Sequence, residues 1–432
     1  MICENIGVNE LNHLTFAGQD TVMLAKTYKT PLYLMDEERI RKNIRTYQDA
    51  LREAFGERAE VLYAGKACAF TELYRILAEE GAGIDVVSQG ELYTALKASY
   101  PVSHACFHGN NKTDEDLRYA VGAGVGYICV DSEDELDALE QIAAQMGERQ
   151  RILIRVTPGI DPHTYDAVST GKVDSKFGSA IATGQAEAMI RKALSLRHIN
   201  LAGIHCHVGS QVFAEDVFER AADVMLRFMA EMREKCSVTL ETLDLGGGYG
   251  VRYVETDPVL DIQKKIGEVA QVIHRICGEL DFPVPFILLE PGRSIVADAG
   301  MTLYTVGSVK RIPGYKAYVS VDGGMSDNPR YALYRSKYTV LSAGEAACGE
   351  TEPFTVVGRL CESGDILQEN VPLPTDMKRG DILAVCTTGA YNYAMASLYN
   401  RLPRPPIVML NKGSSRVAVR RETLADVASL DI

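Results

Sequence analysis

Short runs of apolar residues alternate with longer amphipathic stretches from residue 61 to about residue 293. The short runs have the length of buried strands. In stretches such as TELYRILAEEG (71–81), apolar residues recur at the three- and four-residue spacing of a helix, and a glycine closes the segment. Eight strands each followed by a helix are typical of a (β/α)8 barrel of about 250 residues; an open doubly wound sheet is the alternative. The predicted strands are 61–67, 83–88, 105–110, 126–132, 151–158, 201–208, 242–247 and 286–291.

The pattern changes after about residue 294. Runs such as KAYVSVDGG (316–324) and FTVVGRLCESGDIL (354–367) predict strands separated by glycine, proline and aspartate turns, with few helical stretches. We therefore predict an α/β chain of two domains. A TIM-like (β/α)8 barrel would span residues 35–293, and residues 1–34 and 294–432 would form a β-rich sandwich or barrel domain.

Composition and charge narrow the class of protein. The chain has 45 basic and 58 acidic residues, a net charge of −13, which argues against a nucleic-acid or anionic-membrane partner. No apolar run approaches the length of a membrane span, and the first residues lack the layout of a signal peptide. Ten cysteines are scattered without a CxxC pair, as expected for reduced thiols. We expect a cytoplasmic protein.

Polar residues stand at nearly every predicted strand end, where a barrel of this kind gathers its chemistry. A single polar residue there is usually structural, but so many at one end of a barrel favour a functional site. They are Lys66, Asp85, His108, Arg155, His205, His207, Glu290 and Arg293.

Lys66 lies inside the predicted buried strand VLYAGKA (61–67). Burying an ammonium group is costly unless the group is paired, snorkelled to the surface or chemically used. A lysine whose pKa is lowered by burial can form a Schiff base with an aldehyde. Its small neighbours Ala64, Gly65 and Ala67 would leave room for a flat ring. A snorkelled or edge lysine is the alternative.

His205 and His207 are two residues apart on a predicted strand, so both rings would point to one face of the sheet. Such a pair could hold a metal ion in a barrel hydrolase. The sequence offers no HxxEH motif or equivalent carboxylate cluster to complete the site. We therefore predict no metal.

The last predicted strands are followed by groups suited to an anion. Ser210 offers a hydroxyl, and the glycines of DLGGGYG (244–250) allow backbone amides to approach a phosphate closely. Glu290 needs a cationic partner, such as a protonated pyridine nitrogen, and Arg293 suits a phosphate or carboxylate. A structural Glu290–Arg293 pair is the alternative. With a lysine amine and an imidazole, these are the parts needed to hold pyridoxal phosphate.

The chain resembles the fold type III pyridoxal-phosphate-dependent decarboxylases, and within them the diaminopimelate decarboxylases. The resemblance runs over nearly the whole chain and rests on motifs in order: YAGKA, GIDVVSQGEL, FHGNNKTDEDL, DPHTY, HCHVGSQ, LGGGYG, EPGRS, DGGMSDNPRYALY, LCESGD and GAYNYAMASLYN. It implies an N-terminal barrel, a C-terminal β-domain and a homodimer with active sites at the subunit interface. The implied reaction converts meso-2,6-diaminopimelate to L-lysine and CO2.

The resemblance also implies a role for each matched residue. Lys66 would carry the cofactor as a Schiff base, and Cys361 would donate a proton; Cys361 and Glu362 would come from the partner subunit. The implied cofactor-binding residues are Lys66, His207 on the ring, Ser210, Gly246, Gly247 and Gly248 at the phosphate, Glu290 at the pyridine nitrogen, Gly292, Arg293 and Tyr391. The implied substrate-binding residues are Arg293, Arg330, Tyr334, Glu362 and Tyr391.

Specificity within the family stays open. Arginines suit a substrate whose far end carries a carboxylate, whereas a lysine or ornithine decarboxylase would need an acid there. Tyr331 and Arg359 depart from the family's usual residues beside the substrate motifs. One alternative is a relative acting on D-lysine, D-ornithine or a carrier-bound amino acid. Another is a non-catalytic pyridoxal-phosphate-binding pseudoenzyme, against which the intact Arg330, Cys361 and Glu362 argue.

Overall fold

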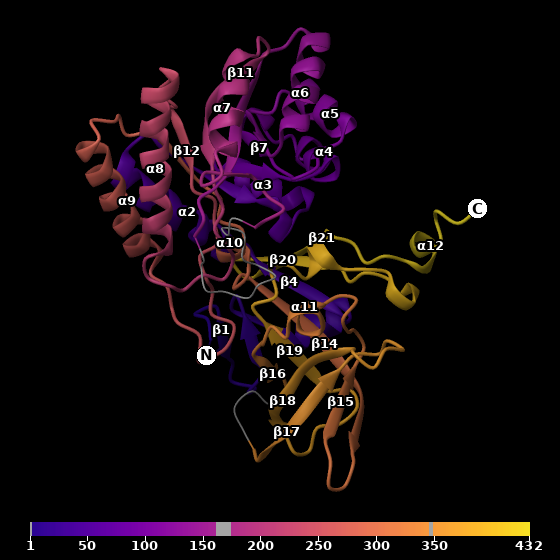
Figure 1. Cartoon of the computed structure of the whole chain (residues 1–432). Coiled ribbons are helices and arrows are strands. Elements are labelled where there is room, and N and C mark those ends of the chain that lie inside the picture. The colour runs from indigo at the N-terminus through magenta and orange to yellow at the C-terminus, as the bar shows by residue number, and fades with distance from the viewer. Residues whose placement is uncertain (1, 161–173, 345–348) are drawn as a thin grey trace. The chain divides into compact units, whose positions relative to one another are not determined.

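The computed structural model of the chain describes residues 2–160, 174–344 and 349–432. The DPHTY motif (161–165) lies outside these ranges. The chain forms two compact units (Figure 1). We call Asn43–Gly250 with Leu260–Gly292 the barrel unit, and Met1–Lys42, Val251–Val259 and Arg293–Ile432 the β-rich unit. The domain boundaries expected at 34/35 and 293/294 stay predictions.

Eight parallel strands form a closed barrel in the barrel unit, which confirms the predicted fold class. Neighbouring strands pair in chain order, β8 pairs with β9, and β13 pairs with β5 to close the ring. A short strand, β10 (Ser179–Ala180), adds to β9. The barrel strands are β5 (Ala59–Ala64), β6 (Gly83–Val86), β7 (Ala105–Phe107), β8 (Tyr127–Val130), β9 (Gln150–Thr157), β11 (Ile199–His205), β12 (Thr242–Asp244) and β13 (Phe286–Leu289).

A helix follows each of the first seven barrel strands: α3 (Thr71–Glu79), α4 (Gln89–Lys97), α5 (Asp114–Ala123), α6 (Glu133–Met146), α7 (Gln185–Ser195), α8 (Val217–Cys236) and α9 (Ile262–Glu279). Local sequence explains their ends. The Ser132 side chain accepts a hydrogen bond from the Glu135 amide at the start of α6, and Gly147 ends it with φ 71°. No helix within the described ranges is long and apolar enough to cross a membrane.

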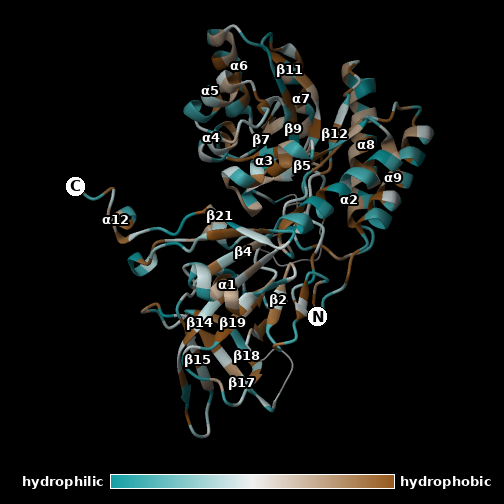
Figure 2. Ribbon diagram, turned by 180° about the vertical axis from the view of Figure 1, so that it is seen from behind, coloured by the Kyte–Doolittle hydropathy of each residue, from teal (hydrophilic) through white to brown (hydrophobic). Residues whose placement is uncertain are grey.

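Apolar side chains from six barrel strands fill the barrel interior. Figure 2 shows hydrophobic colour among the labelled barrel strands and much hydrophilic colour on α8 and α9. This filling is usual for the fold, whose interior is a packed core and not a pore. The cluster consists of Leu62, Cys106, Cys129, Leu153, Ala202 and Leu288.

The β-rich unit is built on a second, mixed sheet of nine strands. Its central strands β4 (Leu32–Asp36) and β14 (Gly300–Arg311) pair antiparallel, and β4 pairs parallel with β20 (Ile407–Asn411). The other strands are β15 (Ala317–Val321), β16 (Val340–Ser342), β17 (Thr351–Val357), β18 (Ile366–Pro374), β19 (Ile382–Cys386) and β21 (Ser414–Val419). Strands β1 (Ile6–Val8), β2 (Leu14–Phe16) and β3 (Gln19–Asp20) form a small separate sheet. The short helices are α1 (Thr21–Tyr28), α10 (Arg293–Val296), α11 (Arg330–Tyr334) and α12 (Leu424–Val427).

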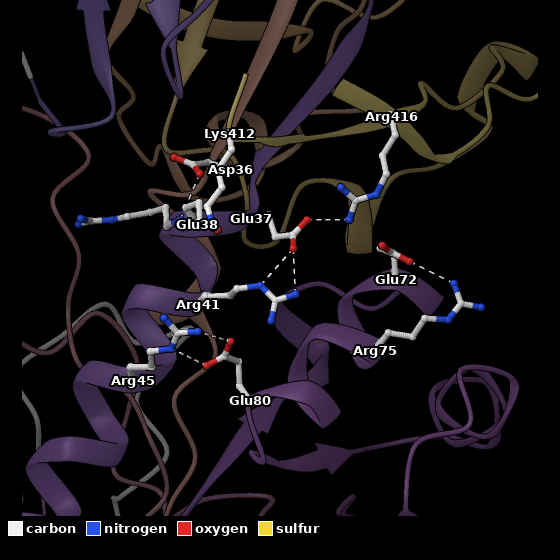
Figure 3. Close-up of polar contacts among 11 residues, drawn as sticks. Asp36, Glu37, Glu38, Arg41, Arg45, Glu72, Arg75, Glu80, Lys412 and Arg416 are labelled. Carbon is white, nitrogen blue, oxygen red and sulfur yellow. Dashed lines mark hydrogen bonds and ion pairs between the residues drawn. The ribbon is translucent and has the colours of Figure 1, made fainter. Parts of the chain in front are cut away.

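A buried carboxylate ties distant parts of the β-rich unit together. Glu37, the first residue of α2 (Glu37–Phe55), has an ion pair of 2.8 Å with Arg41 and one of 2.6 Å with Arg416 of β21 (Figure 3). Its side chain is only 5% exposed, so removing either arginine would leave a poorly compensated buried charge. This contact fixes the start of α2 against the sheet edge.

Candidate functional site

Lys66 lies in a 3-10 turn, Gly65–Ala67, directly after β5 ends at Ala64. It is exposed, so the prediction that Lys66 sits within a buried strand is wrong. The strand ends two residues before Lys66, and the turn carries the residue out at the carboxyl end of the barrel. This is the end at which barrels of this kind place their chemistry.

The small residues around Lys66 serve close packing. A Cβ on Gly65 would lie 2.9 Å from the Tyr74 hydroxyl and 3.0 Å from the Asp85 carbonyl oxygen. A Cβ on Gly292 would lie 2.9 Å from the Cβ of Ala64. Gly65 and Gly292 thus let this turn pack closely against α3, β6 and the end of β5, and the room for a ring beside Lys66 stays a prediction.

Glu290, directly after β13, lies buried between two histidines of the barrel unit. Its Oε1 lies 2.6 Å from Nε2 of His108, and its Oε2 lies 3.2 Å from Nε2 of His205. Burial opposes the ionised carboxylate, but the charges of His108 and His205 outweigh burial and hold the pKa of Glu290 well below its usual value. Glu290 is therefore a carboxylate, the form that can keep a pyridine nitrogen protonated.

His207 differs from His205 in place and state. It follows the end of β11, and its Nδ1 accepts a hydrogen bond of 3.3 Å from the Gly247 amide. Burial, with the charges of Lys66 and Arg155, lowers the pKa of His207 well below its usual value. The ring is thus neutral with its proton on Nε2. The strand ends at His205, so the two rings do not lie side by side on one strand as the sequence suggested. His205 contacts Glu290, and His207 contacts the glycine segment.

The glycine segment after β12 passes against two other loops without room for side chains. A Cβ on Gly247 would lie 2.1 Å from the Glu290 carbonyl oxygen, and one on Gly248 would lie 2.0 Å from the Gly209 carbonyl oxygen. Gly246 and Gly248 have φ of 66° and 115°, which glycine adopts readily. The Gly246 amide donates to Asp244 at 2.8 Å and the Gly247 amide to His207. The phosphate contact of this segment stays a prediction.

Ser210 belongs to the loop that pairs with the glycine segment. The Val212 amide donates to the Gly248 carbonyl at 2.9 Å, and the Gly250 amide donates back to the Val212 carbonyl at 3.0 Å. The structure thus brings together the two loops in which the sequence placed phosphate-binding groups. With Lys66, the ionised Glu290 and the neutral His207, the barrel unit holds groups that fit pyridoxal phosphate.

Two buried arginines of the β-rich unit share a tyrosine. Arg293 Nη1 donates to the Tyr253 hydroxyl at 2.8 Å, and the Arg330 guanidinium carbon lies 4.8 Å from the centre of the Tyr253 ring. Arg330 also donates to the Tyr338 hydroxyl at 2.9 Å and to Ser336 at 3.2 Å. Burial opposes the Tyr253 phenolate, but the arginines outweigh burial and lower the pKa of Tyr253. The arginines are thus held by aromatic rings and hydroxyls.

Tyr253, Tyr338 and Asn392 belong to this cluster and were not predicted. Asn392 Nδ2 donates to the Tyr338 hydroxyl at 3.2 Å, and the rings of Tyr253 and Tyr338 meet edge to face at 5.3 Å. The position of Tyr253, three residues after the glycine motif, was the one feature of the sequence that could have indicated it. Nothing in the sequence pointed to Tyr338. Of the predicted tyrosines, the Tyr391 ring faces Arg293 at 4.6 Å, and Tyr334 is exposed.

Cys361 and Glu362 lie in an exposed turn of the β-rich unit. The Cys361 amide donates to Asn400 at 2.8 Å, and a Glu362 carboxylate oxygen accepts from the Gly364 amide at 3.1 Å. Among the nine cysteines within the described ranges, Cys361 is the exposed one, and none of the nine forms a disulfide. The thiol is accessible on this chain, as a proton donor must be.

Comparisons with known proteins agree with this chemistry. The family described as "Pyridoxal-dependent decarboxylase, pyridoxal binding domain" matches residues 37–297. The chain is 42% identical to the diaminopimelate decarboxylase of Bacillus subtilis, covering 98% of this chain and 96% of that one. It is 44% identical to that of Actinosynnema pretiosum, covering 98% and 93%.

A solved structure shares the fold over almost the same length. The diaminopimelate decarboxylase of M. jannaschii in co-complex with L-lysine superimposes with a TM-score of 0.93 at 33% identity, covering 99% of this chain and 98% of that one. Sequence, fold and the groups of the barrel unit lead to one assignment. The chain belongs to the pyridoxal-dependent decarboxylases, in their diaminopimelate decarboxylase branch, and its cofactor is pyridoxal phosphate.

Proposed function

We propose that the protein decarboxylates meso-2,6-diaminopimelate, giving L-lysine and CO2. The observation that carries this substrate is Arg330, which is 6% exposed and, in the part of the chain that the structure describes, contacts tyrosines and a serine but forms no ion pair with a carboxylate. A buried guanidinium needs an anionic partner. The far carboxylate of diaminopimelate supplies one, whereas L-lysine or L-ornithine as substrate would bring a second cation to it.

The barrel unit would hold the cofactor. Pyridoxal phosphate, when bound, supplies an electron sink for the electron pair left as CO2 departs. We assign covalent attachment to Lys66, ring stacking to the neutral His207, and the ring nitrogen to Glu290. Ser210, the glycines 246–248 and Gly292 would face the phosphate side, together with Arg293 and Tyr391.

The β-rich unit would supply the substrate contacts. Arg330 and Arg293 present planar donors that match a carboxylate, and Tyr334 and Tyr391 offer hydroxyls. Glu362 would bind the ammonium group at the reacting end. Cys361 would transfer its thiol proton to the carbon that has lost CO2, leaving a thiolate that takes up a proton from water.

The test is CO2 release by the purified protein loaded with pyridoxal phosphate. Parallel assays contain meso-diaminopimelate, L-lysine, D-lysine or D-ornithine. Turnover of diaminopimelate alone is expected. Turnover of a D-amino acid would keep the cofactor roles and overturn the substrate assignment. Cofactor binding without turnover of any of the four would contradict the proposed reaction.

Replacing Arg330 with alanine is expected to raise KM for diaminopimelate about ten- to hundredfold. The change removes a charge-assisted contact worth about 1.5–3 kcal/mol. The measurement is steady-state kinetics with fluorescence titration of the cofactor, whose affinity should not change. Arg335→Ala is the matched control, since Arg335 is the exposed residue at the end of the same short helix. An unchanged KM in Arg330→Ala would move the far carboxylate elsewhere.

Replacing Cys361 with alanine is expected to lower kcat about a hundredfold, the usual size of a lost proton-transfer group. Its main-chain hydrogen bond to Asn400 survives the change, so the turn should keep its shape. Cofactor affinity, measured by absorbance titration, should equal that of the unchanged protein. Cys236→Ala, a half-buried cysteine at the end of α8, is the control. Loss of the cofactor in Cys361→Ala would give Cys361 a structural role instead.

We further propose a homodimer in which Cys361 and Glu362 serve the partner subunit's site. Their exposed position on this chain supports this assembly. Mixing inactive Lys66→Ala with the slow Cys361→Ala should raise the activity above that of either variant alone, because mixed dimers contain one complete site. No recovery after subunit exchange would contradict sharing. A cytoplasmic location belongs to the same proposal, and cell fractionation tests it.

A further inference from the structure

Five ionisable side chains, Glu290 among them, meet inside the barrel unit. They come from five different strand ends and are each at most 6% exposed. One ring nitrogen from each of His108 and His205 and one carboxylate oxygen from each of Asp244 and Glu290 all lie within 4.8 Å of one another. Asp85 adds its Oδ1 at 4.0 Å from Nε2 of His108. The sequence marked His108 and Asp85 as polar strand ends, and the proposed function gives neither a role.

The two imidazoles bracket the Glu290 carboxylate. His108 approaches Oε1 at 2.6 Å and His205 approaches Oε2 at 3.2 Å, and their rings meet at 4.8 Å between centres. Both contacts use Nε2: the His205 contact is a hydrogen bond, and the His108 contact is an ion pair whose angle falls outside hydrogen-bond geometry. A carboxylate has about four acceptor positions, so both oxygens keep lone pairs for a third donor.

The protonation states of the buried histidines and acids in this cluster depend on burial and on the neighbouring charges. Burial opposes a charged imidazole, but Cys129 and Glu290 outweigh burial and raise the pKa of His205 to about 9. Burial opposes a charged His108 as well, and Cys106 and Glu290 raise the pKa of His108 well above its usual value. Burial, followed by the charge of Glu290, raises the pKa of Asp244 well above its usual value, which keeps that acid neutral. Glu290 is thus the carboxylate that the imidazoles compensate.

We propose that His108 and His205 are positioning residues that keep Glu290 ionised and fixed in one orientation, so that it can hold the proton on the ring nitrogen of pyridoxal phosphate. The inference rests on the proposed function of Glu290. A lone glutamate in so buried a place would take up the ring proton itself, because an uncompensated buried charge is costly. The two imidazoles remove that cost.

The titratable groups that interact with Glu290 or with its two histidines come from β6, β7, β8, β11 and β12. Asp85 comes from β6, Cys106 and His108 from β7 and its end, Cys129 from β8, His205 and His207 from β11 and the loop after it, and Asp244 from β12. Lys66 adds its charge near Asp85. Within the described residues, His205 hydrogen-bonds one carboxylate oxygen and His108 forms an ion pair with the other.

The test uses the full-length protein with pyridoxal phosphate and no substrate. His108→Gln keeps a donor of similar reach and loses the positive charge. We measure the cofactor dissociation constant and the absorbance of the bound cofactor from mildly acidic to mildly alkaline pH. Loss of the cation lets the Glu290 pKa rise into the measured range. At the acid end, His108→Gln should bind the cofactor about tenfold more weakly. The difference should shrink as pH rises and Glu290 ionises.

The controls separate this inference from the proposed function. His104→Gln changes an exposed histidine just before β7 and should match the unchanged protein. His205→Gln, at the longer contact, should show a smaller loss of cofactor affinity in the same direction. It replaces His108→Gln in the test if circular dichroism shows that His108→Gln does not fold.

Equal affinities and spectra at every pH in both variants would overturn the inference while leaving the function standing. A stoichiometric metal ion in the purified protein would also overturn it. No cofactor binding by the unchanged protein would instead refute the function.

Discussion

Replacing Lys66 with alanine is expected to abolish decarboxylation and covalent attachment of the cofactor. The amine is the one group for which the chain offers no substitute at this turn, since its immediate neighbours are Gly65 and Ala67. Activity should fall by at least about a thousandfold, because a covalent route is lost together with cofactor orientation. The measurements are CO2 release and the yellow absorbance band of the protein-linked cofactor.

Two variants make that result specific to the amine of Lys66. Lys66→Arg keeps a positive charge without a nucleophilic amine and should be as inactive as Lys66→Ala. Lys97→Ala removes an exposed lysine at the end of α4 in the same unit and should leave the band intact. Retention of the band in Lys66→Ala would assign the attachment to another lysine.

Replacing Glu290 with glutamine is expected to lower kcat about a hundred- to thousandfold, the usual size of a lost preorganised electrostatic contact. The amide matches the carboxylate in shape but cannot hold the ring nitrogen protonated, so the cofactor loses its power as an electron sink. Steady-state kinetics should show the loss in kcat with little change in KM, because the far end of the substrate is untouched.

The conservative variant of Glu290 provides the check on this reading. Glu290→Asp keeps the charge at a shorter reach and should recover part of the lost kcat. Equal defects in Glu290→Asp and Glu290→Gln would mean that shape, and not charge, is what Glu290 supplies. Unchanged kcat in Glu290→Gln would remove the residue from the proposed chemistry.

Much of the fold was predictable because its signals are local. The alternation of short apolar runs with helical spacing gave all eight barrel strands, with ends that differ from the observed ones by a few residues. Serine and glycine at the ends of α6 marked that helix by their capping chemistry. Lys66 shows the limit: its strand looked continuous to Ala67, and the structure ends the strand at Ala64.

The candidate site was predictable as a set of residues and not as an arrangement. The motif resemblance identified Glu290, Arg293 and Arg330 as site residues but did not predict which side chains of the protein contact them. The sequence could not show that His108, far from Glu290 along the chain, lies 2.6 Å from it, or that Tyr253 lies between two arginines. Such contacts depend on barrel closure and on loop paths, which no local pattern encodes.

By itself, the sequence of this protein determined the succession of strands and helices, the change to a β-rich second part, and the family that its motifs match. Periodicity and capping act over a few residues, so a linear reading can recover them. The tertiary structure alone decided the exposure of Lys66, the opposite states of His205 and His207, and the bracket around Glu290. These depend on burial and on charges brought close by packing, and both are fixed only when distant strands pair.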